Sequence, residues 1–175
     1  MRVVAGTARG RRLEAPPGSV TRPTSDRVRD AIATALGSLG MVAGSAVLDL
    51  WAGSGAMGIE LLSRGARSAT FVERDRRALE TIRGNLERTG LVAASTVARD
   101  DALTWCATGG RHDVALCDPP YVFDDWPALL AVVPAPFVVA ESARPVAATD
   151  GWGLVREKRY GTTVVTFLRR QEQAP

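Results

Sequence analysis

Residues 118–121, Asp-Pro-Pro-Tyr, carry the most suggestive chemistry in this chain of 175 residues. They directly follow the apolar run 114–117, which is typical of a buried parallel strand. Asp118 and the carbonyl of Pro119 can accept the two N–H groups of a planar amino group, and neither proline has an N–H to compete. The ring of Tyr121 offers a face on which a base can stack. A plain turn remains the alternative, because Asp-Pro is common in turns.

A glycine-rich turn follows another apolar strand in residues 47–58, Val-Leu-Asp-Leu-Trp-Ala-Gly-Ser-Gly-Ala-Met-Gly. Gly53, Gly55 and Gly58 match the dinucleotide-binding pattern G-x-G-x-x-G, so a nicotinamide or flavin dinucleotide must be considered. Asp49 favours a different ligand, because a carboxylate repels a pyrophosphate but attracts a cation. S-adenosylmethionine has a sulfonium, an ammonium group and no phosphate, and therefore suits this acid better.

Two further acids end the strands that follow in sequence. Glu73 comes 20 residues after Gly53, the usual spacing for a carboxylate that binds ribose hydroxyls. Asp101 or Asp100 can accept the exocyclic amine of an adenine, and Asp101 is preferred because Ala102 leaves room beside the ring. Asp49, Glu73, Asp101 and Asp118 thus follow four successive apolar strands, along the edge where open α/β sheets bind ligands.

Together these motifs resemble the class I S-adenosylmethionine-dependent methyltransferases that modify exocyclic amino groups. Residues 1–6, 10–13 and 21–31, above all Arg-Pro-Thr-Ser-Asp-Arg-Val-Arg at 22–29, are similar to the bacterial 16S rRNA guanine-N2 methyltransferases of the RsmD family. Residues 159–163, Arg-Tyr-Gly-Thr-Thr, fit that family's closing hairpin, so the similarity spans nearly the whole chain. Trp51 departs from related loops, where a smaller residue or phenylalanine is commoner.

The resemblance implies transfer of a methyl group from S-adenosylmethionine to the N2 amine of a guanine in 16S rRNA. The expected substrate is a small-subunit assembly intermediate, and the enzyme is expected to be a monomer. The implied cofactor-binding residues are Arg22, Pro23, Thr24, Asp49, Ala52, Gly53, Ser54, Gly55, Glu73, Asp101 and Ala102. The implied catalytic residues, which hold the base, are Asp118, Pro119, Pro120 and Tyr121.

Charge is distributed unevenly along the chain, whose net charge is +3. Residues 1–30 have a net charge of +4, residues 31–143 of −4 and residues 144–170 of +4. Basic ends around an acidic middle suit phosphate contacts at the edges and a cationic cofactor at the centre. The residues expected to contact RNA are Arg9, Arg11, Arg12 and Arg27.

Other residue types narrow the function classes. A single histidine and two cysteines without metal-ligand spacing predict that the protein binds no metal. No apolar run approaches the ~20 residues that span a bilayer, and no secretion signal is visible. A cytoplasmic protein without membrane contacts is therefore expected.

The fold class predicted is α/β, Rossmann-like, with a seven-stranded, mostly parallel sheet and one antiparallel strand. A small basic β-hairpin and linker are expected at 1–20, and the methyltransferase domain at 21–175. In the hairpin, residues 3–5 and 12–14 form the strands. Helices are expected near 24–39, 56–64, 75–88 and 101–108. A fifth strand is expected at 137–140, and two more at 153–158 and 163–169.

Three other functions stay open. The 118–121 motif can hold an adenine N6 or cytosine N4 amine as well as guanine N2, so guanine rests on the resemblance. An adenine-N6 methyltransferase of DNA or RNA is the first alternative, although a DNA enzyme needs a recognition region for which 175 residues leave no space. A dinucleotide-binding protein, or an RNA-binding assembly protein without transfer activity, is the alternative from another class.

Overall fold

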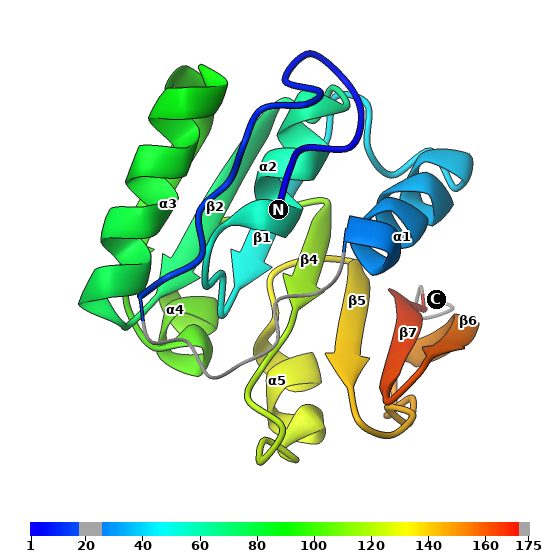
Figure 1. Cartoon of the computed structure of the whole chain (residues 1–175). Coiled ribbons are helices and arrows are strands. Elements are labelled where there is room, and N and C mark those ends of the chain that lie inside the picture. Colours follow the sequence, from blue (N-terminus) through cyan, green and yellow to red (C-terminus); the bar gives the residue numbers. More distant parts are fainter. Residues whose placement is uncertain (18–25, 172–175) are drawn as a thin grey trace.

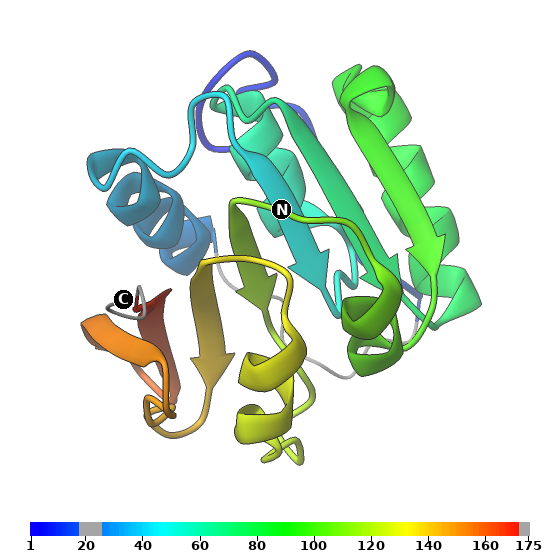
Figure 2. The ribbon, with the colours of Figure 1, turned by 180° about the vertical axis from the view of Figure 1, so that it is seen from behind.

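The computed structural model describes residues 1–17 and 26–171, which form a seven-stranded sheet with helices on both faces (Figures 1 and 2). The strand order is β3-β2-β1-β4-β5-β7-β6. The strands are β1 (Ala46–Leu50), β2 (Ser68–Glu73), β3 (Ser95–Arg99), β4 (Val114–Cys117), β5 (Phe137–Ser142), β6 (Trp152–Tyr160) and β7 (Thr163–Arg170). The helices are α1 (Asp26–Ser38), α2 (Ala56–Ser63), α3 (Arg76–Thr89), α4 (Ala102–Thr108) and α5 (Trp126–Val132), with a 3-10 turn at Val92–Ala94.

Strand directions confirm the predicted fold class. Strands β1 to β5 pair with one another in parallel, and β7 runs antiparallel to both β5 and β6. One reversed strand therefore sits in an otherwise parallel sheet. The tight turn between β6 and β7 contains Gly161 with a φ of 61°, a conformation that glycine adopts at little cost.

Each face of the sheet packs against its own helices. Ile32 of α1, Ile59 of α2 and Ile82 of α3 are fully buried on one face. Cys106 of α4 and Leu129 of α5 are buried on the other. The central strands β1 and β4 are buried at every position, which explains why both are apolar apart from Asp49 in β1.

The parallel register brings the strand ends together. Leu50 lies opposite both Val72 and Cys117, and Cys117 lies opposite Ala140. The chain therefore leaves β1, β2, β4 and β5 at nearly the same level, and the residues that end these strands face one region of the surface.

The structure does not show the predicted N-terminal hairpin as a pair of strands. Residues 3–5 and 12–14 do not form two strands, and one isolated antiparallel bridge joins Arg2 to Arg12. Backbone hydrogen bonds still join the two segments, from Val3 to Arg11, from Gly10 to Val3 and from Leu13 to Met1. The N–H groups of Val4 and Ala5 bind the carboxylate of Glu60, at 2.8 and 3.0 Å, and so attach the segment to α2.

The N-terminal segment is instead part of the core. Val3, Ala8 and Leu13 are buried in the cluster that α1 and α2 share. The hydroxyl oxygen of Ser63, at the end of α2, accepts a hydrogen bond from the N–H of Ala8 at 2.9 Å. The predicted boundary between residues 20 and 21 lies in 18–25, outside the described residues.

Glu60 is a fully buried acid at the centre of an ionic network. Its Oε1 accepts from Arg64 at 2.8 Å, and its Oε2 lies 3.5 Å from Nε of the buried Arg29. Two backbone N–H groups of the N-terminal segment complete the shell, as described above. A buried carboxylate is tolerable only with such partners.

No helix in the part of the chain that the structure describes is long and apolar enough to cross a membrane. Within the same residues, no group of three or more His, Cys, Asp or Glu side chains is placed to hold a metal ion.

Glu60→Gln should destabilise the protein by about 3 kcal/mol, because removing one charge from a buried network leaves the buried Arg29 with only the half-exposed Asp26 as an acidic partner. Urea unfolding of the free protein measures the change. The matched control is Glu87→Gln on the exposed face of α3, which should shift stability by less than about 0.5 kcal/mol. Equal stability of the two variants would show that the network contributes nothing.

Candidate active site

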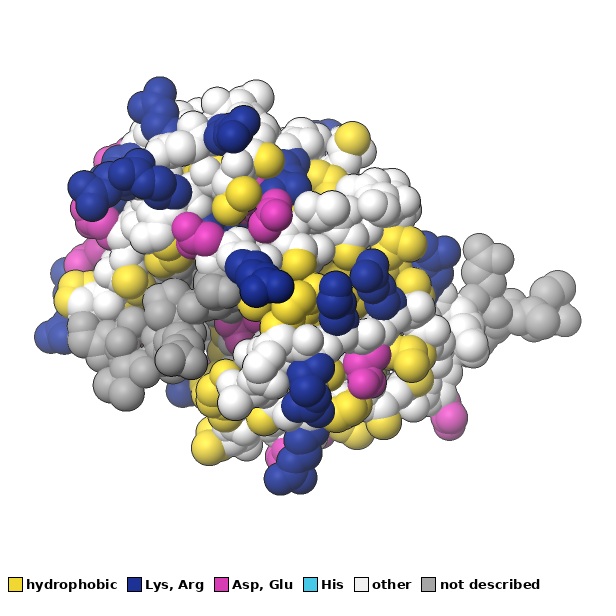
Figure 3. Space-filling view, turned by 45° about the vertical axis from the view of Figure 1, so that its right-hand side comes forward, with side chains coloured by type: hydrophobic (Ala, Val, Ile, Leu, Met, Phe, Trp, Pro, Cys, Tyr) yellow, Lys and Arg dark blue, Asp and Glu magenta, His cyan; other side chains and the backbone are white. Residues whose placement is uncertain are grey.

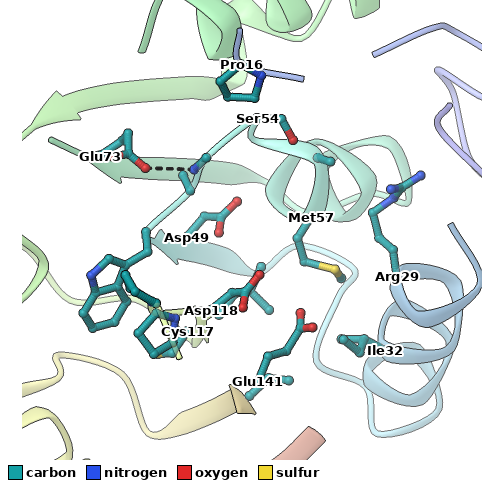
Figure 4. Close-up of a pocket in the computed structure, with 18 of the residues that line it drawn as sticks. Pro16, Arg29, Ile32, Asp49, Ser54, Met57, Glu73, Cys117, Asp118 and Glu141 are labelled. Carbon is teal, nitrogen blue, oxygen red and sulfur yellow. Dashed lines mark hydrogen bonds between the residues drawn. The ribbon is translucent and has the colours of Figure 1, made fainter. Parts of the chain in front are cut away.

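A cavity of about 280 Å³ lies at the carboxyl ends of β1, β2, β4 and β5 (Figure 4). It brings together most of the site residues that the sequence predicts: Asp49, Ala52, Gly53, Ser54, Glu73, Asp118, Pro119, Pro120 and Tyr121 all line it. The glycine turn borders it on one side, and the loop after β4 on the other. The two motifs of the sequence thus form one site.

Other predicted residues lie elsewhere. Asp101 is the N-cap of α4 and accepts the N–H groups of Leu103 and Thr104, and neither it nor Ala102 is among the described residues that line the cavity. Gly55 is the N-cap of α2, with a φ of 73°, and is not among the described residues that line the cavity. Arg22, Pro23 and Thr24 lie outside the described residues.

Asp49 is a buried acid at the cavity wall. Burial raises the pKa of Asp49 from 3.8 to about 8, the hydrogen bond from Gly58 lowers it in part, and the charges of Asp118 and Glu73 raise it further. The Gly58 N–H donates to Oδ2 at 2.9 Å. A cation in the cavity would favour the ionised form of Asp49, whereas a phosphate would oppose it.

The third glycine of the motif serves this acid. A Cβ at Gly58 would lie 2.5 Å from Cε1 of Phe71 and 2.9 Å from Oδ2 of Asp49. The helix can therefore approach β1 and β2 only with glycine at this position. The pattern G-x-G-x-x-G has a packing reason here, independent of any pyrophosphate.

Glu73 organises the opposite wall. Its Oε2 accepts the N–H of Gly53 at 3.0 Å, drawn as the dashed line in Figure 4. Its Oε1 accepts the N–H groups of Arg74 and Asp75 at 2.8 and 2.9 Å. A carboxylate offers about four acceptor sites, so one is left for a ligand hydroxyl.

The glycine turn contains a strained residue. Trp51 has a φ of 55°, which is costly for a bulky side chain and is found mainly where surrounding contacts impose it. Its ring lies 5.1 Å from that of Phe123, which in turn meets Trp126 at 5.3 Å. These aromatic contacts join the loop after β1 to the loop after β4. The unusual residue of the motif is thus a link between the two halves of the site.

The base-binding motif lies at the open side of the cavity. Asp118 projects into the cavity and is exposed, Pro119 is buried, and Tyr121 is 68% exposed. A group that enters from outside can therefore reach Asp118 and the Tyr121 ring without a rearrangement of the core.

Sequence reasoning did not assign several residues of the cavity to the site, among them Met1, Arg29 and Glu141. The Sδ atom of Met1 lies 3.9 Å from Oγ of Ser54 and 3.8 Å from Nη1 of Arg29. Glu141 lies at the end of β5 and is 7% exposed. The rule that found Asp118 would have found Glu141, since both are acids at the end of a buried strand. Met1 and Arg29 belong to the segments 1–6 and 22–29 that carry the family resemblance, but neither was assigned to the cofactor pocket.

Asp49→Asn should stabilise the free protein as pH rises. The folded state holds the proton of Asp49 up to about pH 8, whereas the unfolded chain loses it near 3.8. Unfolding therefore releases a proton in this window, and the free energy of unfolding falls with rising pH. The asparagine of the variant does not titrate, so the free energy of unfolding of the variant should not fall in this way. The variant should be as stable as the parent protein at about pH 4 and more stable by a few kcal/mol at about pH 8, since one pKa unit corresponds to ~1.4 kcal/mol.

Urea unfolding across this pH range tests the expectation. Asp150→Asn, in an exposed turn, is the matched control and should follow the parent protein. An advantage of Asp49→Asn that does not change with pH would contradict the raised pKa.

Comparison with known proteins places the chain in a family. The family described as "Conserved hypothetical protein 95" matches residues 1–169. Ribosomal RNA small subunit methyltransferase D of Escherichia coli is 32% identical over 99% of this chain and 91% of its own length. YlbH of Bacillus subtilis is 35% identical over 98% of this chain and all of its own length.

Solved structures agree with this relationship. The Escherichia coli protein yhhF has a TM-score of 0.85 at 30% identity, covering 99% of both chains. TTHA0928 of Thermus thermophilus has a TM-score of 0.80 at 30% identity, covering 95% of this chain and 98% of its own. The fold alone also matches SMU.776, complexed with SAH, with a TM-score of 0.65 at 13% identity over 82% of this chain and 48% of its own. The resemblance to the RsmD methyltransferases is confirmed, and the chain belongs to the Conserved hypothetical protein 95 family.

Proposed function

We propose that the protein transfers a methyl group from S-adenosylmethionine to the exocyclic N2 amine of a guanine in 16S rRNA. The observation that carries this proposal is the shared cavity, in which a buried acid and a glycine turn face an open Asp-Pro-Pro-Tyr motif. The name of the Escherichia coli relative, a small-subunit rRNA methyltransferase, supports the choice of substrate. An assembly intermediate as substrate, and a monomeric enzyme, are part of the same proposal.

The residues of the inner wall fit a cationic cofactor. Asp49 would face the positively charged methionine end, Gly53 and Ser54 would line it, and Glu73 would accept a ribose hydroxyl. A bound S-adenosylmethionine supplies the methyl group, which passes to the amine nitrogen as the carbon–sulfur bond breaks and S-adenosylhomocysteine forms. A dinucleotide fits less well, because its pyrophosphate would lie near Asp49.

The outer wall would hold the base. Asp118 and the carbonyl of Pro119 accept the two N–H groups of the amine, which directs the nitrogen lone pair toward the methyl donor. Most of the rate acceleration then comes from positioning and from dipoles that are already oriented. The alkylated nitrogen is acidic and loses its proton readily, so a strong base is not required. Tyr121 would stack on the base after it leaves the helix.

Asp118→Ala should lower methyl transfer by about 100-fold or more while S-adenosylhomocysteine binding changes little, because Asp118 contacts the base and not the cofactor. Transfer of labelled methyl groups to undermethylated small subunits measures the first, and titration calorimetry the second. Asp150→Ala is the matched control. A rate near that of the parent protein would remove Asp118 from the mechanism, and absence of transfer by the parent itself would refute the proposed function.

The proposed RNA contacts lie around the cavity and beyond it. Arg9, Arg11, Arg12 and Arg27 are all exposed. The turn that carries Arg9 packs on Ser63, at the end of α2 remote from the cavity, whereas Met1 lies at the cavity itself. Helix α2 has eight residues and is therefore about 12 Å long, a distance that an RNA stem easily spans. Figure 3 shows basic side chains around a hollow in which acidic ones are visible.

Replacing Arg9, Arg11 and Arg12 by alanine should weaken RNA binding and flatten its salt dependence, by roughly 0.7–0.9 in log–log slope for each phosphate that an arginine no longer neutralises. Filter binding of 16S rRNA at several salt concentrations measures this slope. The control removes three exposed arginines elsewhere, Arg77, Arg83 and Arg111. Equal weakening in the two triple variants would mean that only net charge matters, and that the N-terminal turn does not bind RNA.

A further inference from the structure

Glu141 is a cavity residue to which the proposed reaction gives no role. It follows Ala140, which lies opposite Cys117 in the parallel pairing of β5 with β4. Asp118 and Glu141 each come directly after a residue of this last pair, so the two acids leave the backbone next to adjacent strand ends.

Both acids point into the same space. Side chains alternate along a strand, and Leu116 and Val139, two residues earlier, line the same cavity. Figure 4 shows the side chains of Asp118 and Glu141 at the same cavity, which both residues line. Asp118 is exposed, whereas Glu141 is 7% exposed. A planar base that enters past Asp118 therefore meets Glu141 with its inner edge.

Two adjacent acceptors select a particular edge. Guanine presents its N1–H next to its N2 amine, so both neighbouring groups are donors. Adenine and cytosine present an unprotonated ring nitrogen, an acceptor, next to their amine. A carboxylate can accept from the first kind of edge and opposes the second. The resemblance to a family was needed to choose guanine from the sequence, but this pair of acids makes the choice on chemical grounds.

We propose that Glu141 accepts the N1–H of the target guanine while Asp118 and Pro119 hold its amine, so that Glu141 determines the specificity for guanine. This inference rests on the proposed methyl transfer to a base amine. It assigns the remaining acid of the cavity to the substrate and not to the cofactor.

The test removes the N1–H donor of the substrate, together with the oxygen at C6. The target guanosine, once mapped, is replaced by 2-aminopurine in small-subunit RNA that is ligated from fragments and reconstituted. 2-Aminopurine keeps the amine but has an unprotonated N1. The parent protein should methylate it at least about 100-fold more slowly than guanine, because a site built to accept an N–H strongly rejects an analogue that lacks it. 6-Thioguanine, which keeps both donors, is the matched substrate and should react within about tenfold of guanine.

Glu141→Gln provides the second arm. Its amide can donate to the unprotonated N1, so the preference for guanine over 2-aminopurine should shrink by tenfold or more, with S-adenosylhomocysteine affinity unchanged. Glu87→Gln is the control and should keep the parental preference. Equal reaction of guanine and 2-aminopurine with the parent protein would overturn the role of Glu141 and leave methyl transfer intact. An equal loss for both bases in Glu141→Gln would also overturn it, whereas no transfer to any RNA base would refute the proposed function itself.

Discussion

The site depends on one electrostatic constraint: an acid, Asp49, is buried at the end of a central strand where solvent does not stabilise its charge. Its pKa of about 8 records that cost. The surrounding residues make the position possible without removing the cost. Gly58 donates one hydrogen bond and lets α2 approach, and Phe71 closes the space behind. A cationic ligand would offset the remaining cost, and the proposed cofactor is a cation at its methionine end.

Helix α2 connects Asp49 to Met1 and Arg29, two residues that line the cavity from the N-terminal segment and from α1. Its first turn follows the glycine loop at the cavity, and its middle carries Glu60, which binds the N-terminal segment and Arg29 of α1. Arg29 in turn lies beside Met1 over the cavity. The buried ionic network therefore holds the N-terminal segment and α1 in one position relative to the glycine turn. In some proteins, buried ionic groups fix one arrangement of the chain and do not raise its net stability.

Sequence patterns predicted the sheet and the strand-end acids well, because buried parallel strands give continuous apolar runs and end at one edge. They did not predict contacts between distant parts of the chain, such as the hydrogen bonds from Val4 and Ala5 to Glu60 that attach the N-terminal segment to α2. Helix α5 was not predicted. It is short, and Pro127 indicates a helix start only when Asp125 before it is identified as the N-cap. Asp101 follows β3 as expected, yet the structure uses it as a helix cap. A strand-end acid alone does not distinguish a ligand-binding role from a capping role.

The crowding of acids also bears on how the two ligands combine. Asp118 and Glu73 both raise the pKa of Asp49, so the cavity by itself holds charges that oppose one another. A cation that binds at Asp49 relieves this repulsion, and donors that bind at Asp118 and Glu141 relieve it from the other side. Each ligand therefore changes the electrostatic environment that the other meets, and such coupling is reciprocal by thermodynamic necessity. The charge state of Asp49 consequently links the binding of the methyl donor to the binding of the base.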